Sequence, residues 1–270
     1  MARTLKLTLS YDGSNYSGWQ RQINGPSVQA VLEDELSAIV GTPVTIMAAG
    51  RTDAGVHAAG QVASVTLDHA IGCDDLVRAL NARLPQDVRV RHAEERFARF
   101  DARIYATSKT YRYAIWNGGA PNPFFRHVVW HVPQRLDVDL MSRAAALLVG
   151  EHDFVAFQAA GSDVKTTVRT LLGSELREVD IHADQPIAVP PLPGESERVG
   201  GRLLRYEVTG TGFLRHMVRI IVGTLVEVGR GRMAVDDLMA VLASRDRSQA
   251  GQTAPPQGLM LWEVQYESEK

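Results

Sequence analysis

The chain has almost no cysteine and no long apolar run. Cys73 is the only cysteine in 270 residues, so an internal disulfide and a cysteine-built zinc site are both excluded. No stretch reaches the roughly 18–20 uninterrupted apolar residues that a membrane helix needs. The segment from Met1 to Gly13 has no apolar core followed by a small-residue cleavage site, so we expect no signal peptide. These absences favour a cytoplasmic protein that has no membrane partner.

Lysine is also scarce, and the numbers of basic and acidic residues are nearly equal. The formal net charge is −2, and only four of the 29 basic residues are lysines, which leaves 25 arginines. The net charge alone argues against a nucleic-acid partner, but it is a poor guide where charges are segregated. Arginine forms bidentate hydrogen bonds to phosphates, whereas lysine supplies only a point charge. Genomic base composition is an alternative explanation of the arginine content.

One basic segment is interleaved with aromatic residues. It runs from Arg89 to Arg112 and contains Arg89, Arg91, Arg96, Arg99, Arg103, Lys109, Arg112, Phe97, Phe100, Tyr105 and Tyr111. Such a segment suits a surface that follows a nucleic-acid backbone and stacks on bases. A solvated strand and loop would have the same composition, so both interpretations stay open.

The apolar periodicity of the first half predicts a β-α-β-β-α-β order. Alternation at Leu5, Leu7 and Leu9 predicts a strand, and Pro26-Ser27 begins a helix that Gly41 ends. Strands are expected over 44–48 and 61–67 and from Val88, with a second helix between Asp74 and Leu84. This order is the ferredoxin-like plan.

The second half shows a similar alternation of elements. Strands are expected over 109–116, 127–132, 167–182, 202–209 and 260–266, and helices over 139–148, 215–228 and 235–243. The proline-rich segment 183–201 is expected to be a mobile loop between two strands. We therefore predict an α+β protein of two ferredoxin-like, RRM-like halves, residues 1–105 and 106–270, with antiparallel sheets joined around a central cleft.

The segment from Ala49 to Val62 is the strongest candidate for chemistry. It lies between two expected strands, and loops on a rigid scaffold are where catalytic groups usually lie. Gly50, Gly55 and Gly60 permit positive φ and close approach of a ligand backbone. Asp53 is either a catalytic carboxylate or a turn residue that hydrogen-bonds its own backbone. This segment does not match a phosphate-binding loop, because no Lys-Ser or Lys-Thr follows the glycines.

Several motifs together resemble the tRNA pseudouridine synthase A family. The central one is Gly50-Arg51-Thr52-Asp53-Ala54-Gly55-Val56-His57. The others are Tyr11-Asp12-Gly13, Gly18-Trp19-Gln20-Arg21-Gln22, Asn81-Ala82-Arg83-Leu84-Pro85, Phe97-Ala98-Arg99-Phe100, Lys109-Thr110-Tyr111-Arg112-Tyr113, Gly150-Glu151-His152-Asp153-Phe154 and Phe213-Leu214-Arg215-His216-Met217-Val218-Arg219 with Ile220-Ile221-Val222-Gly223. The matches run in the family's order from Tyr11 to about Gly229.

The resemblance implies isomerisation of uridine in the anticodon stem-loop of tRNA, at positions 38, 39 and 40, by a homodimer. It assigns the nucleophile to Asp53, and a carboxylate suits attack near a glycosidic bond. It also assigns the stacking platform for the flipped uridine to Tyr111 and the ionic partner of Asp53 to Arg219. Arg51 would contact a phosphate or fill the space that the base leaves. Neither a cofactor nor a metal is expected, because the rearrangement adds no atom and changes no oxidation state.

Two other functions fit parts of the pattern. A non-catalytic RNA-binding protein with tandem RRM-like halves would share the fold, but the chain lacks the Lys/Arg-Gly-Phe-Gly-Phe type of run. An Asp-dependent hydrolase of N-glycosides would use a similar carboxylate. That class usually has a second carboxylate for acid catalysis, and none stands near Asp53 in the motif.

Overall fold

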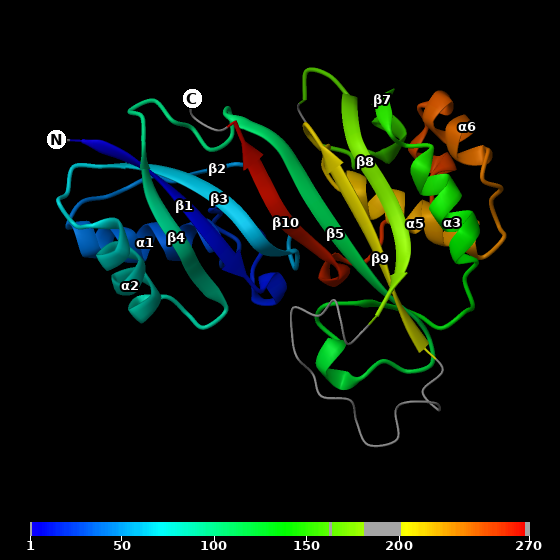
Figure 1. Ribbon diagram of the computed structural model, residues 1–270, viewed down its shortest axis with the longest axis horizontal. Helices are drawn as coiled ribbons and strands as arrows, with labels where there is room; N and C mark the ends of the chain where they lie inside the picture. The colour runs from blue at the N-terminus through cyan, green and yellow to red at the C-terminus, as the bar shows by residue number, and fades with distance from the viewer. Residues whose placement is uncertain (1, 162–163, 181–200, 268–270) are drawn as a thin grey trace. The chain divides into compact units, whose positions relative to one another are not determined.

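The computed structural model describes residues 2–161, 164–180 and 201–267, and these divide into two compact units (Figure 1). Unit 1 consists of Met1–Lys109 and Met260–Lys270, and unit 2 consists of Thr110–Leu259. Both contain helices and mostly antiparallel strands, so the predicted α+β class is confirmed. No helix of the described residues is long and apolar enough to cross a membrane. The segment 183–201, expected to be a loop, lies outside the described residues except for Gly201.

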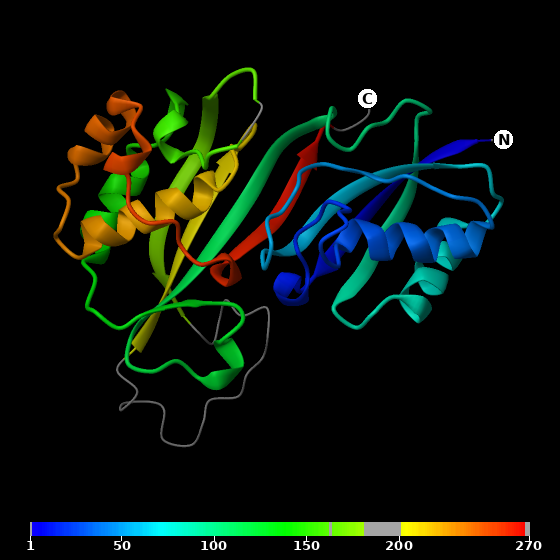
Figure 2. The same cartoon turned by 180° about the vertical axis from the view of Figure 1, so that it is seen from behind.

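Unit 1 is built on three long antiparallel strands and two helices. The strands are β1 (Arg3–Tyr11), β2 (Met47–Ala48), β3 (His57–Leu67), β4 (Val88–Arg96) and β10 (Leu259–Tyr266), and the helices are α1 (Val28–Val40) and α2 (Cys73–Arg83). Strand β1 lies between β3 and β4 and is antiparallel to both. Strand β2 pairs with β3 over two residues, and β10 runs parallel to β3 at Met260 and His57. Helices α1 and α2 cover one face of these strands (Figure 2).

Local sequence accounts for the first elements of unit 1. Leu5, Leu7 and Leu9 are fully buried, because side chains two residues apart share one face of a strand. The Ser27 side chain accepts a hydrogen bond from the Ala30 amide and caps α1, while Gly41 ends the helix with φ 76°. Both ends of α1 therefore lie where the sequence predicts them.

The described part of unit 2 contains three helices and a mostly antiparallel set of strands. The strands are β5 (Ala106–Gly118, which begins in unit 1), β6 (Trp130–Val132), β7 (Gly150–Asp153), β8 (Val168–Val179) and β9 (Gly201–Gly210), and the helices are α3 (Val138–Ala146), α5 (Met217–Gly229) and α6 (Asp237–Ser244). Strand β6 is parallel to its partner β5. The described residues of the two units also form five single turns of 3-10 helix: η1 (Gly13–Asn15), η2 (Pro123–Phe125), η3 (Val155–Phe157), η4 (Arg247–Gln249) and η5 (Pro256–Gly258). Helix α5 is apolar on nearly every side and is buried, as expected of a central helix.

Three features differ from the sequence-based expectations. The strand expected over 44–48 forms only at Met47 and Ala48. Helix α2 begins at Cys73, one residue before the expected start, so Asp74 lies in the first turn, where a negative charge interacts favourably with the helix dipole. The last strand was expected in the second half, whereas most of β10 belongs to unit 1. Its pairing with β3 joins residues far apart in the sequence, which no local pattern indicates.

Helix α5 approaches the segment before β10 so closely that it needs a glycine. A Cβ added at Gly223 would lie 1.7 Å from the carbonyl oxygen of Gln252. A Cβ added at Gly173, in β8, would meet nothing within 4 Å.

We expect Gly223→Ala to destabilise the protein by about 1–3 kcal/mol or more, because backbone must move to admit the methyl group. Gly173→Ala is the matched control and should be neutral or stabilising by up to about 1 kcal/mol. Thermal unfolding of both variants measures the difference. Equal melting temperatures for the two variants would contradict the close approach.

Candidate active site

Asp53 begins a tight turn between β2 and β3. Its carbonyl oxygen accepts a hydrogen bond from the Val56 amide at 3.1 Å, and Gly55 occupies the turn with φ 76°. A positive φ at this position favours glycine. Asp53 is half-buried, whereas Arg51 is exposed and Thr52 is buried. The loop therefore carries a half-buried carboxylate two residues after an exposed guanidinium.

The structure gives the three loop glycines, Gly50, Gly55 and Gly60, different roles. Gly55 alone of the three adopts a positive φ. Gly60 is required for close packing, because a Cβ there would lie 2.5 Å from the carbonyl oxygen of Trp262. At Gly50 a Cβ would make only ordinary van der Waals contact with the Lys109 side chain, whose Cε would lie 3.5 Å away.

The segment from Tyr11 to Trp19 holds the Asp53 turn against the rest of unit 1. The Trp19 amide donates to the Thr52 carbonyl at 3.0 Å, and the Gly55 amide donates to the Tyr16 carbonyl at 3.2 Å. A Cβ at Gly13 would lie 2.0 Å from the Val56 oxygen, and one at Gly18 would lie 2.6 Å from the Thr52 oxygen. Two motifs that are far apart in the sequence thus form one backbone assembly.

Hydrogen bonds between buried hydroxyl and amide side chains stabilise the segment that leads into the same turn. The Tyr11 hydroxyl and the Thr52 hydroxyl are 2.8 Å apart, and Gln61 Nε2 lies 3.4 Å from the Tyr11 oxygen. Gln61 Nε2 also donates to the Gly50 carbonyl at 2.8 Å. Burial raises the pKa of the Tyr11 hydroxyl to about 12, so it remains a neutral hydrogen-bonding group in the ordinary pH range.

His57 is buried and links the turn to the end of β1. Its Nδ1 lies 3.0 Å from both the Gly13 amide nitrogen and Asp12 Oδ1. One nitrogen cannot accept from the first and donate to the second at once. We favour the bond from Gly13, because Asp12 Oδ1 already accepts from the Ser14 amide and hydroxyl. This geometry suits a structural role for His57.

Tyr111 lies on β5 in unit 2 and is 8% exposed. Phe213 packs edge-to-face against it, with ring centroids 5.0 Å apart and an interplanar angle of 78°. Edge-to-face packing fixes the orientation of the Tyr111 ring.

Arg219 lies in the first turns of α5, where nearly all neighbours on the helix are apolar. Its Nε donates to the Ala254 carbonyl at 2.8 Å, and its own carbonyl accepts from the Ala254 amide at 3.0 Å. Burial raises the pKa of the Tyr113 hydroxyl, and the positive charge of Arg219 opposes that shift. The guanidinium is therefore fixed in place by the backbone of a second segment.

The four predicted site residues are thus divided between the units. Asp53 and Arg51 share one turn of unit 1, and Tyr111 and Arg219 lie on a strand and a helix of unit 2. Sequence reasoning named Lys109 only as one basic residue of the segment 89–112 and gave it no role at the Asp53 loop, although its side chain lies against Gly50. The available signal was its spacing, because Lys109 precedes Tyr111 by two residues on an expected strand.

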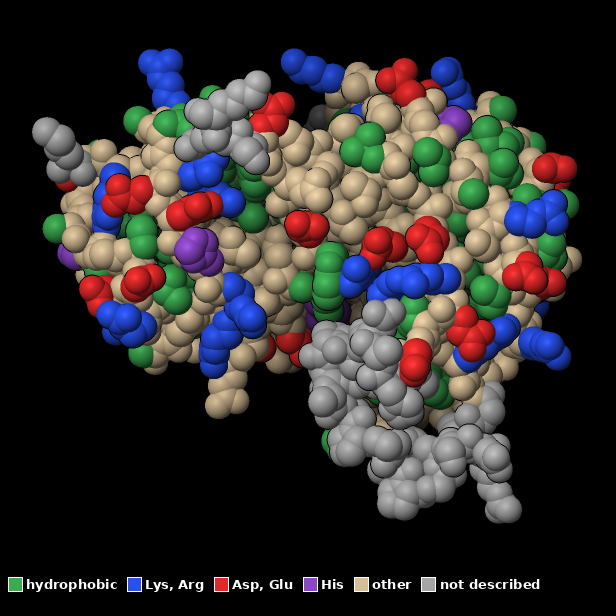
Figure 3. Space-filling model, viewed as in Figure 1, with side chains coloured by type: hydrophobic (Ala, Val, Ile, Leu, Met, Phe, Trp, Pro, Cys, Tyr) green, Lys and Arg blue, Asp and Glu red, His purple; other side chains and the backbone are tan. Residues whose placement is uncertain are grey.

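Several arginines of the basic segment 89–112 contact other groups of the protein itself. Arg89 Nη1 donates to the carbonyl oxygens of Pro85 and Val88 at 2.5 and 2.6 Å. Arg96 lies over the Phe100 ring, and Arg112 pairs with Glu207. On the face drawn in Figure 3, basic and acidic side chains are interspersed. A nucleic-acid track along this segment stays a prediction, which rests mainly on the exposed Arg91, Arg99 and Arg103.

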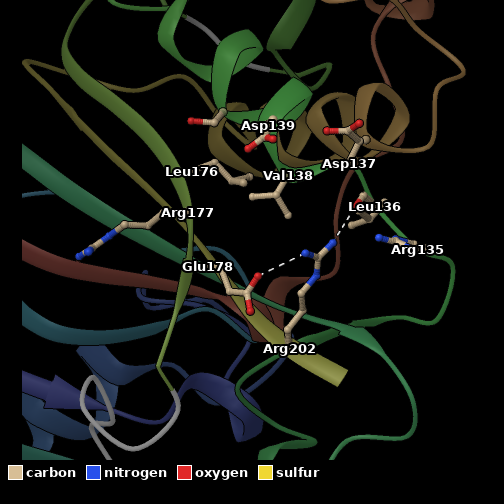
Figure 4. A pocket seen from close by; sticks show the side chains of 11 residues that line it. Arg135, Leu136, Asp137, Val138, Asp139, Leu176, Arg177, Glu178 and Arg202 are labelled. Carbon is tan, nitrogen blue, oxygen red and sulfur yellow. Dashed lines mark hydrogen bonds and ion pairs between the residues drawn. The ribbon is translucent and has the colours of Figure 1, made fainter. Parts of the chain in front are cut away.

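A cavity of about 810 Å³ in unit 2 contains none of the predicted site residues. It lies between the start of α3, the end of β8 and the start of β9 (Figure 4). Arg202 crosses it, with Glu178 at 3.2 Å and the Leu136 carbonyl at 2.6 Å. These contacts hold the chain that enters α3. The part of the chain that the structure describes has no group of three or more His, Cys, Asp or Glu side chains that could hold a metal ion.

The hydroxyl pair below the turn can be tested by a double-mutant cycle. Tyr11→Phe should cost about 1–3 kcal/mol of unfolding free energy, because it leaves the buried Thr52 hydroxyl without its phenol partner. Tyr11→Phe with Thr52→Val should cost less than the sum of the single changes. Denaturant unfolding measures all four proteins, and strict additivity would contradict the pairing.

Comparisons with known proteins agree with the motifs. A family model described as tRNA pseudouridine synthase matches residues 8–103 and 144–267. The chain is 41% identical over 264 residues to tRNA pseudouridine synthase A of Acetivibrio thermocellus, covering 98% of this chain and 100% of that protein. It is 45% identical to the Myxococcus xanthus protein of the same name, covering 97% and 91% of the two chains.

A solved structure is far less similar. The match to a crystal structure of an unknown protein from Galdieria sulphuraria covers 86% of this chain and 94% of that one, at 13% identity and a TM-score of only 0.22. The family match includes the Asp53 turn and the segment that holds it. The chain therefore belongs to the tRNA pseudouridine synthase family.

Proposed function

We propose that this protein isomerises uridine to pseudouridine at positions 38, 39 and 40 in the anticodon stem-loop of tRNA, with Asp53 as its nucleophile. The observation that carries the proposal is the Asp53 turn, which two motifs of the family fix in one backbone assembly. The curated relatives bear the name tRNA pseudouridine synthase A over nearly the full length of this chain.

The reaction breaks the N1–C1′ bond of uridine and joins C5 to C1′, with loss of the C5 proton. A carboxylate can serve it in three ways: attack at C1′, addition at C6, or removal of the C2′ proton. The half-buried position of Asp53 suits each of them, since part of the carboxylate remains accessible. We leave the three routes open.

Tyr111, Arg51 and Arg219 take the roles that the family resemblance implies. Extruding the uridine from its stack costs a few kcal/mol, and stacking on the Tyr111 ring would return roughly 1–3 kcal/mol. The exposed Arg51 would contact phosphate or occupy the space of the flipped base. Arg219, which the Ala254 carbonyl holds in place, would stabilise the ionised Asp53.

The proposal extends to the assembly and the fold. We propose a homodimer, with one tRNA lying across both subunits, and a cytoplasmic location, as a tRNA substrate implies. We also propose two ferredoxin-like halves, with residues 1–105 supplying the Asp53 loop and residues 106–270, apart from the last strand that groups with unit 1, supplying Tyr111 and Arg219. The β-α-β-β-α-β order of unit 1 supports the first half of this division.

An N-glycoside hydrolase is the alternative with a different product. It would release free uracil from the RNA, whereas an isomerase leaves the base attached through C5. A non-catalytic RNA-binding protein would give neither product. Chromatography of the nucleosides and free bases after treatment of tRNA separates all three.

Asp53→Asn should abolish pseudouridine formation and leave most of the affinity for tRNA, because phosphate contacts dominate binding. Asp74→Asn, an exposed carboxylate at the start of α2, is the matched control and should keep wild-type activity. Tritium release from tRNA that carries 5-tritiated uridine measures the reaction. Activity of Asp53→Asn within roughly tenfold of wild type, about 1.4 kcal/mol in activation free energy, would remove Asp53 from the nucleophile role.

Tyr111→Phe and Tyr111→Leu separate the ring of this residue from its hydroxyl. Phe keeps the stacking face, so it should retain substantial activity if stacking is the main role, and Leu should not. If the hydroxyl helps to remove the C5 proton, Phe should slow tritium release by about 10²–10⁴-fold. Tyr206→Phe removes another buried hydroxyl of unit 2, bonded to Ser174, and should change activity little. Wild-type tritium release by both Tyr111 variants would make Tyr111 a core residue only.

A further inference from the structure

Lys109 lies against the backbone that leads into the Asp53 turn. A Cβ built on Gly50 would meet Lys109 Cε at 3.5 Å and Cδ and Nζ at 3.7 Å. The last three atoms of the side chain therefore extend across Gly50. The Gly50 carbonyl accepts a hydrogen bond from Gln61 Nε2 at 2.8 Å. Both Lys109 and Gly50 belong to unit 1, so this contact lies within one compact unit.

The strand that carries Lys109 also carries Tyr111. Side chains two residues apart on β5 point to the same side of the strand, so the ammonium and the proposed stacking ring share one face. Asp53 follows Gly50 by three residues, which span at most about 10 Å of extended chain. The Lys109 ammonium is thus near the nucleotide on which Asp53 would act.

The Lys109 ammonium has no anionic partner among residues 2–161, 164–180 and 201–267. The side chain makes no hydrogen bond and no ion pair with any described residue, although Lys109 is half-buried. Burial lowers the pKa of Lys109, and the positive charge of Arg103 lowers it further. By contrast, Lys6 of the same unit pairs with Glu94 at 2.7 Å. A half-buried charge without a counterion destabilises a protein, so a ligand is the expected source of compensation.

We propose that Lys109 binds a backbone phosphate of the target nucleotide and so holds that nucleotide beside Asp53. RNA offers one anion for each nucleotide, and its bases are neutral, so the phosphate is the group that can offset the ammonium charge. Lysine acts here as a compact point charge, whereas the nearby Arg51 is free to take a second phosphate or the space of the base. This assignment rests on the proposed function, because it requires an RNA substrate at the Asp53 turn.

The salt dependence of tRNA binding tests the assignment. Binding is measured in the Asp53→Asn background with an unmodified tRNA transcript, so that no turnover occurs. Lys109→Met should weaken binding by roughly 10- to 100-fold at low salt. It should also flatten the slope of log K against log salt by about 0.7–0.9, the contribution of one phosphate. Lys109→Arg keeps the charge and should keep the slope.

Lys6→Met is the matched control, because it removes a lysine of unit 1 that already has a carboxylate partner. Its salt slope should equal that of the Asp53→Asn parent. Lys109→Met should also unfold at an equal or higher temperature than the parent, since it removes an uncompensated charge. A lower melting temperature for Lys109→Met would make Lys109 a structural residue.

An unchanged salt slope in Lys109→Met would overturn the phosphate contact, and it would point to a contact with the uracil or to packing alone. Failure of the proposed function is a separate result. In that case the wild-type protein forms no pseudouridine in tRNA, whatever the slopes of the variants.

Discussion

The close packing of two backbone segments in unit 1 is the constraint on which the candidate site depends. Only glycine fits at positions 13 and 18, because a Cβ there would overlap the carbonyl oxygens of Val56 and Thr52. Hydrogen bonds from Trp19 and Gly55 join the same segments. Loops usually move more than the elements they connect, and a nucleophile must stay close to its productive position. The glycine contacts restrict the motion of this loop, because they make the Asp53 turn part of the packed unit.

Polar groups beneath the turn extend this constraint. The Tyr11 and Thr52 hydroxyls bond to each other, and Gln61 reaches both Tyr11 and the Gly50 carbonyl. Buried polar groups specify one arrangement only if they are satisfied. The same network fixes Gly50, against which the Lys109 side chain lies. Positioning of the carboxylate and placement of the nearby cation therefore follow from one set of contacts.

Sequence patterns predicted the elements better than their distant contacts. The alternation at Leu5, Leu7 and Leu9 and the residues that end α1 are local signals, and the structure confirms them. The pairing of β10 with β3 is not local, so periodicity could not place that strand in unit 1. The candidate site shows the same limit. The Asp53 motif stands out as a sequence, but the contact between Lys109 and Gly50 depends on tertiary packing, and only the spacing from Tyr111 indicated its face of β5.

Position-resolved mapping of pseudouridine in tRNA tests the central claim most directly. Unmodified transcripts are treated with the purified protein, and each uridine is then assigned as uridine or pseudouridine. The account predicts conversion at one or more of positions 38, 39 and 40, with other uridines unchanged and no free uracil released. Unmodified uridine at all three positions, in transcripts that carry uridine there, would contradict the account.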